Sequence, residues 1–209
     1  MARRREERLK QACEKLGVNA HYVVCDICSI QKLDDFVNNC IEVFGNVHDV
    51  LVNNAGVYVA KNWENITESD WNCQFDTNAK GSYFATLKFL KLWKDQNIKG
   101  NMVFVALDRA YQGDITPYGM TKAAVDNFVK GLVKEAIQYG IRVNGVAPGM
   151  TASEINHVDP NSNIRVDFTR RKRLILAGEI AEVVGFLVSD VSKCIVGDVI
   201  LCDEGEALR

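Results

Sequence analysis

The sequence predicts an α/β domain built on a parallel β-sheet with helices on both faces. Short apolar runs, of the length of buried strands, alternate with longer segments whose apolar residues recur every three or four positions. The chain has 209 residues, of which 47% are hydrophobic, which is enough for one well-packed core. No repeat, low-complexity tract or linker divides it, so residues 1–209 are expected to form a single domain.

Helices are expected where the periodic segments meet residues suited to helix ends. The expected helices span Ala2–Leu16, a segment between Ser29 and Gly45, a long segment from Thr67 to about Lys94, a segment beginning at Pro117, and Glu179–Val188. The expected strands are Ala20–Ile27, Val47–Asn53, Met102–Leu107, Ile141–Ala147 and Val199–Cys202. Residues 151–173 are polar and predict an irregular segment.

Charge and composition argue against several classes of function. The net charge is −2, so nothing indicates a nucleic-acid partner. No apolar run approaches the ~20 residues of a membrane span, so no membrane partner is expected. We expect a cytoplasmic protein. The seven cysteines are scattered, as reduced thiols would be, and Cys25-Asp26-Ile27-Cys28 lacks the second pair or histidine cluster of a zinc site. No metal site is therefore predicted.

The strongest chemical signal is the pair Tyr118 and Lys122. Thr116 and Pro117 are a suitable N-cap and first residue for a helix, on which residues four apart share one face. An ammonium group beside a phenol favours the phenolate, so we expect Lys122 to lower the pKa of Tyr118. Tyr118 could then transfer a proton near neutral pH.

Three further motifs surround this pair in sequence order. Asn53-Asn54-Ala55-Gly56 ends an apolar run, Asn78 lies in Asn78-Ala79-Lys80-Gly81, and Val143-Asn144-Gly145-Val146-Ala147-Pro148-Gly149 follows the Tyr118 helix. In this order the motifs resemble the short-chain dehydrogenase/reductase family, over nearly the whole chain from about Arg3 to Gly205. The resemblance implies a Rossmann-like, doubly wound parallel sheet and hydride transfer between NAD or NADP and a carbonyl or secondary alcohol.

The resemblance also implies roles for individual residues. Tyr118 would be the acid or base, Lys122 would tune it and contact the nicotinamide ribose, and Asn78 would hold a water molecule linked to Lys122. The cofactor cleft would be lined by Tyr118, Lys122, Asp26, Asn53, Ala55, Gly56, Pro148, Gly149 and Thr151. Arg3 and Arg4 would lie near a 2′-phosphate, which slightly favours NADP. Family members are usually dimers or tetramers, so a homo-oligomer is implied.

One departure from the family pattern is the lack of a glycine-rich turn between a first strand and a first helix. We expect that the chain begins just after the family's second strand, and that two strands and one helix, on the order of 35 residues, are absent. The run Tyr22–Cys25 would then have no neighbouring strand. An alternative function follows: an inactive or truncated relative that acts as an interaction or oligomerisation protein.

A second departure concerns the serine that polarises the substrate oxygen in this family. The corresponding stretch, Val105 to Tyr111, has neither serine nor threonine. Asp108 could donate a hydrogen bond only if protonated, and Thr116 is too close to Tyr118, so the serine role stays unassigned. The substrate stays open among oxoacyl, sugar or polyol, and hydroxysteroid types.

Overall fold

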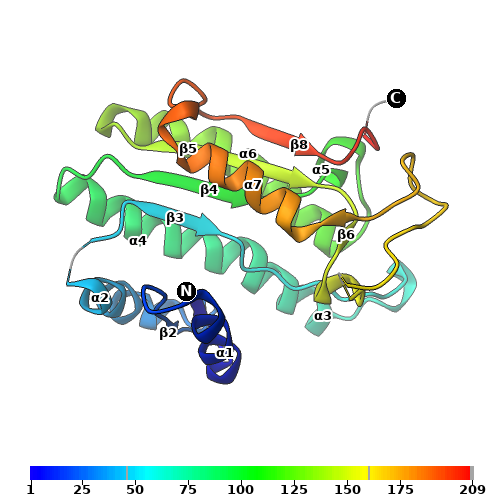
Figure 1. The fold of residues 1–209 in the computed structure, drawn as a ribbon, viewed down its shortest axis with the longest axis horizontal. Helices are drawn as coiled ribbons and strands as arrows, with labels where there is room; N and C mark the ends of the chain where they lie inside the picture. The colour runs from blue at the N-terminus through cyan, green and yellow to red at the C-terminus, as the bar shows by residue number, and fades with distance from the viewer. Residues whose placement is uncertain (46, 160, 208–209) are drawn as a thin grey trace.

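The computed structural model describes residues 1–45, 47–159 and 161–207 and shows an α/β fold with a parallel sheet. Four strands lie in the order β3-β4-β5-β8, and every neighbouring pair is parallel (Figure 1). Their bounds are Val50–Asn53 for β3, Asn101–Val105 for β4, Arg142–Pro148 for β5 and Val199–Cys202 for β8. The predicted fold class is confirmed.

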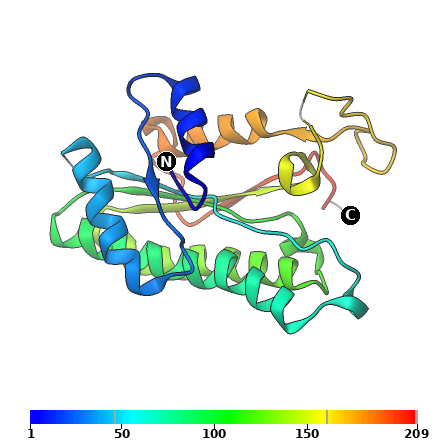
Figure 2. The ribbon, with the colours of Figure 1, turned by 90° about the horizontal axis from the view of Figure 1, so that it is seen from below.

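Helices cover both faces of this sheet because successive strand residues point to opposite sides. On one face, Met102 and Phe104 pack with apolar residues of α2, α4 and α6, and on the other Val103 packs with Leu187 of α7. Figure 2 shows α7 (orange) across the sheet from α4 and α6 (green). The bounds are Leu33–Phe44 for α2, Ser82–Asp95 for α4, Pro117–Ala136 for α6 and Ala177–Val188 for α7.

The N-terminal part differs from the prediction. Ala2–Arg3 form a strand, β1, and the helix α1 begins only at Glu6 and ends at Leu16. The expectation that Tyr22–Cys25 would lack a neighbour is wrong, because β2 (Val23–Val24) pairs in parallel with β1. Among the described residues no ladder hydrogen bond joins this pair to β3.

The long helix expected from Thr67 to Lys94 is confirmed in extent but is not a uniform α-helix. Thr67 and Asp70 form a capping box at the start of α3 (Glu68–Gln74). A π-helical segment, η3 (Phe75–Gly81), follows and continues directly into α4. Such wider turns are rare and occur frequently at functional sites. Asn78 lies in the middle of this one.

The remaining elements are short. The strand expected to reach Leu107 ends at Val105, because residues from Arg109 form the short helix α5. The segment expected to be irregular, 151–173, begins with a two-residue strand, β6, which pairs in parallel with β7 just beyond the end of that segment. The bounds are Arg109–Gln112 for α5, Thr151–Ala152 for β6 and Ile175–Leu176 for β7, with 3₁₀ turns at Ile30–Lys32, Trp63–Asn65, Ile137–Tyr139, Glu154–Asn156 and Asp190–Ser192. Within the described ranges, no helix has the length and apolar character needed to cross a membrane.

Candidate active site

Tyr118 and Lys122 share one face of the first turns of α6, as their spacing predicts. The helix begins at Pro117, and the Thr116 hydroxyl accepts a hydrogen bond from the Gly119 N–H at 3.2 Å. The Lys122 ammonium lies 5.7 Å from the centroid of the Tyr118 ring. Lys122 is only 4% exposed, and its Nζ donates to the carbonyl oxygen of Val105 at 2.7 Å. A buried cation therefore lies beside a phenol at the end of β4.

The expectation that Lys122 lowers the pKa of Tyr118 is wrong. Burial raises the pKa of Tyr118 to about 12, Tyr58 and Asp108 raise it further, and Arg109 is the cation that lowers it. Burial also lowers the pKa of Lys122 to about 8. The reason is that burial penalises the charged form of each group, and Lys122 directs its ammonium to a backbone carbonyl.

Asn78 joins this pair to the loop after β3. Its Oδ1 accepts from the Val57 N–H at 2.8 Å, and its Nδ2 donates to the Val57 carbonyl at 2.9 Å and to the Thr121 hydroxyl at 3.1 Å. The Thr121 hydroxyl in turn donates to the Tyr118 carbonyl at 2.7 Å. A Cβ atom at Gly56 would lie 3.7 Å from both Asn78 Oδ1 and Lys122 Nζ. The sequence-predicted catalytic residues thus meet at one place.

The other predicted cleft residues follow two strands of the same sheet. Asn53, Ala55 and Gly56 lie at the end of β3, whereas Pro148, Gly149 and Thr151 lie at the end of β5. These strands are parallel, so their carboxyl ends share one edge, where ligands of such sheets bind. Asn53 Nδ2 is buried without a hydrogen-bond partner among the described residues, and such an orphaned donor fits a ligand acceptor.

The loop after β5 needs glycine. A Cβ atom at Gly149 would lie 3.0 Å from the Cα of Asp203, so a side chain there would push two backbones apart. Thr151 donates to the Gly149 carbonyl at 2.9 Å and thereby holds the turn.

Asp26 lies in a separate hollow formed by β2 and α2. This cavity, of about 370 Å³, is also lined by Arg4, Ser29 and Lys32. Asp26 Oδ1 accepts from the Cys28 N–H at 3.1 Å. Arg4 but not Arg3 is thus brought to the predicted acidic residue. Burial raises the pKa values of the Cys25 and Cys28 thiols, and no cluster of metal-ligating side chains occurs in the part of the chain that the structure describes.

Asp108 has a structural role at the position where the serine was sought. It is 8% exposed, and its Oδ1 accepts from the Arg109 N–H at 2.7 Å, which caps α5. Burial raises the pKa of its carboxyl group.

Sequence reasoning missed two residues of the site. The ring centroid of Tyr58 lies 5.0 Å from that of Tyr118, and Thr121 connects Asn78 to α6. The sequence signal for Tyr58 was its position shortly after a predicted parallel strand, because ligands bind at the carboxyl ends of such strands.

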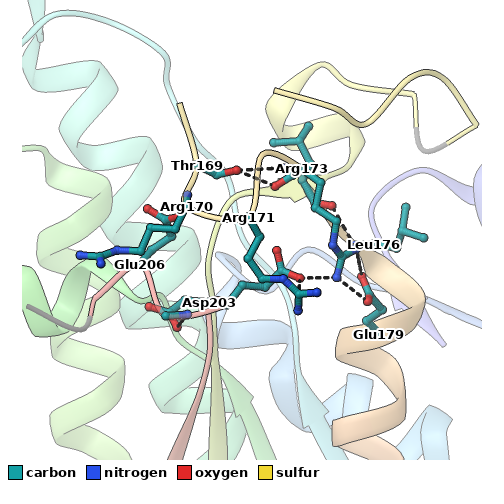
Figure 3. A network of polar contacts seen from close by, with 11 residues as sticks. Thr169, Arg170, Arg171, Arg173, Leu176, Glu179, Asp203 and Glu206 are labelled. Atoms are coloured by element: carbon teal, nitrogen blue, oxygen red, sulfur yellow. Dashed lines mark hydrogen bonds and ion pairs between the residues drawn. The ribbon is translucent and has the colours of Figure 1, made fainter. Parts of the chain in front are cut away.

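Ion pairs fasten the segment before α7 to the end of β8 (Figure 3). The Arg173 guanidinium donates to both carboxylate oxygens of Glu179 at 2.9 and 2.8 Å and also pairs with Glu204. Arg171 lies 3.4 Å from the same Glu204 carboxylate. Glu204 has φ of 57°, a left-handed conformation that is unusual for a residue other than glycine. The network fixes the segment that follows Thr151 in the chain.

A comparison with models of protein families identifies the family to which this chain belongs. The family model described as Enoyl-(Acyl carrier protein) reductase matches residues 1–206. The chain belongs to the short-chain dehydrogenase/reductase family. By family and fold it is an NAD(P)-dependent oxidoreductase with a Rossmann-like sheet.

Individual relatives agree with this assignment. The chain is 30% identical to the (2S)-[(R)-hydroxy(phenyl)methyl]succinyl-CoA dehydrogenase subunit BbsD of Thauera aromatica, over 97% of this chain and 83% of that protein. It is 28% identical to an L-rhamnose 1-dehydrogenase (NADP(+)) of Thermoplasma acidophilum, over 93% of this chain and 79% of that protein. The solved structure of ElxO with NADP bound has a TM-score of 0.85 at 25% identity and covers 98% of this chain and 85% of its own.

Proposed function

We propose that this protein interconverts a carbonyl and a secondary alcohol, with Tyr118 exchanging the proton at the substrate oxygen. The observation that carries the proposal is the meeting of Tyr118, buried Lys122 and Asn78 at the carboxyl edge of the sheet. The Lys122 ammonium has three N–H donors, and among the described residues it donates only to the Val105 carbonyl, so donors remain for a ribose or phenolate oxygen.

The described residues fit the nicotinamide end of a bound NAD(P), which supplies the hydride. Lys122, Gly149 and Thr151 would hold that end, and Asn53, Ala55 and Gly56 would line the cleft toward the adenosine. Arg4 and Asp26 line the same hollow, in which the adenosine ribose would be bound. The guanidinium of Arg4 favours the 2′-phosphate of NADP. No glycine-rich turn between a strand and a helix occurs among the described residues, so no residue is assigned to the pyrophosphate.

Turnover of a substrate panel tests the proposal. Oxidation of NADPH or NADH is followed with acyl, sugar-lactone and polyketide-like carbonyl compounds, and the reverse reaction with L-rhamnose and other secondary alcohols. Tyr118→Phe should lower kcat about 1,000-fold or more, because it removes the exchanging proton. Tyr139→Phe, in the 3₁₀ turn that follows the far end of α6, is the matched control. Equal kcat values for the wild type and Tyr118→Phe would overturn the assignment.

We also propose that the protein is a cytoplasmic homo-oligomer. Aromatic side chains are exposed beside α6, at Trp71, Tyr83 and Phe84. A groove of about 450 Å³ next to them is lined mostly by apolar atoms of Phe75, Val125 and Phe128. Such a surface is typical of contacts between subunits. Light scattering should give the mass of a dimer or tetramer for the wild type and a smaller mass for Phe84→Glu, whereas a monomeric wild type would contradict the proposal.

A further inference from the structure

A second phenol lies against the proposed proton donor. The centroids of the Tyr58 and Tyr118 rings are 5.0 Å apart and their planes are inclined by 54°. Tyr58 is 36% exposed, whereas Tyr118 is more deeply buried. The proximity of Tyr58 contributes to the raised pKa of Tyr118. Tyr58 is therefore the more exposed of two phenols in contact.

The loop that carries Tyr58 is held on both sides by buried amides. The Val57 N–H and carbonyl are both bonded to Asn78, which is 2% exposed. The Val59 N–H donates at 3.2 Å to Oε1 of Gln74, which is 1% exposed. Both amides come from the continuous helix α3–η3. Two anchors, one residue before and one after Tyr58, fix its position, and a preorganised donor requires such support.

The other hydroxyl groups beside Tyr118 have structural roles in α6. Thr116 accepts from the Gly119 N–H as the helix cap, and Thr121 donates to the Tyr118 carbonyl while it accepts from Asn78. Val105, Ala106 and Leu107 offer no hydroxyl, and Asp108 caps α5. Within the described part of the chain, the Tyr58 hydroxyl makes no hydrogen bond.

We propose that Tyr58 donates a hydrogen bond to the substrate oxygen and thereby performs the polarising role that a serine performs elsewhere in this family. The proposal rests on the proposed function. When bound, the reduced nicotinamide would supply the hydride to the substrate carbon, and Tyr118 would give its proton to the substrate oxygen. Tyr58 keeps its own proton throughout and stabilises the charge that develops on the oxygen. Tyr118 is left as the phenolate and recovers a proton from solvent.

Tyr58→Phe tests the proposal because the ring contact is kept and only the hydroxyl is lost. We expect kcat to fall about 100-fold, the usual effect of removing one donor to a developing oxyanion, with KM changed by less than about threefold. NADPH affinity, measured by nicotinamide fluorescence, should be unchanged. Tyr139→Phe controls for the loss of a phenol hydroxyl away from the site.

Leu107→Ser provides a second, independent readout. It supplies a hydroxyl two residues after β4, so it should restore part of the activity of Tyr58→Phe and change the wild type by less than about threefold. An active wild type with an unchanged kcat in Tyr58→Phe would overturn this inference alone. A folded wild type that shows no turnover would overturn the proposed function and this inference with it.

Discussion

Replacing Asn78 by alanine should destabilise the protein by an amount that the structure allows us to estimate. The side chain is 2% exposed and makes three hydrogen bonds, two to Val57 and one to Thr121. Each such bond contributes about 0.5–1.5 kcal/mol, and a buried backbone group left without a partner costs about 1–3 kcal/mol. We therefore expect Asn78→Ala to lower the free energy of unfolding by about 2–4 kcal/mol.

Asn78→Asp separates the contribution of the hydrogen bond that Asn78 accepts from that of the hydrogen bonds that it donates. A carboxylate can still accept from the Val57 N–H, but it cannot donate to the Val57 carbonyl. The Thr121 hydroxyl cannot donate to it without leaving the Tyr118 carbonyl. The aspartate variant should therefore be no more stable than the alanine variant, although it is closer in shape.

Urea unfolding followed by circular dichroism measures both variants. Asn72→Ala is the matched control, because Asn72 lies in α3 with an exposed side chain and should change stability by less than about 0.5 kcal/mol. An Asn78→Ala protein as stable as Asn72→Ala would refute the view that this amide holds the loop against α6.

Three further predictions concern ionisable groups. Burial lowers the pKa of Lys122 to about 8, so kcat/KM for carbonyl reduction should fall as pH rises above about 8 and the ammonium is lost; a flat profile to pH 10 would contradict this. Arg173 lowers the pKa of Glu179 to about 2, so its contribution to stability is present above pH 4.5 and is lost as the pH falls toward 2. Arg173→Gln should weaken that acid dependence in thermal melts, and an unchanged profile would count against the ion pair. Arg4→Ala should reduce the affinity for NADPH about tenfold while NADH binding stays constant, and an equal loss for both cofactors would exclude a 2′-phosphate contact.

The convergence of Tyr118, Lys122 and Asn78 could be predicted from the sequence because its causes are local. The spacing of the first two fixes their shared helix face, and parallel strands bring the loops after β3 and β5 to one edge. The π-helical segment could not be predicted, because its buried residues Thr77, Asn78 and Gly81 carry no periodic apolar pattern.

Effects that depend on burial or on partners far away in the chain could not be predicted from the sequence either. The pKa shifts of Tyr118 and Lys122 are dominated by burial, which spacing along a helix does not reveal. The ion pair of Arg173 with Glu204 joins residues 31 positions apart. The pairing of Ala2–Arg3 with β2 was missed because two residues carry no periodicity.

A titration of the folded protein with NADPH tests the central claim most directly. If this edge of the sheet holds the nicotinamide end of the cofactor, nicotinamide fluorescence should change with saturation in the micromolar range, and Lys122→Met should weaken binding at least about tenfold. Circular dichroism of the same samples shows that each protein is folded. A folded wild type that binds neither NADPH nor NADH, or a Lys122→Met protein that binds as tightly as the wild type, would contradict the account.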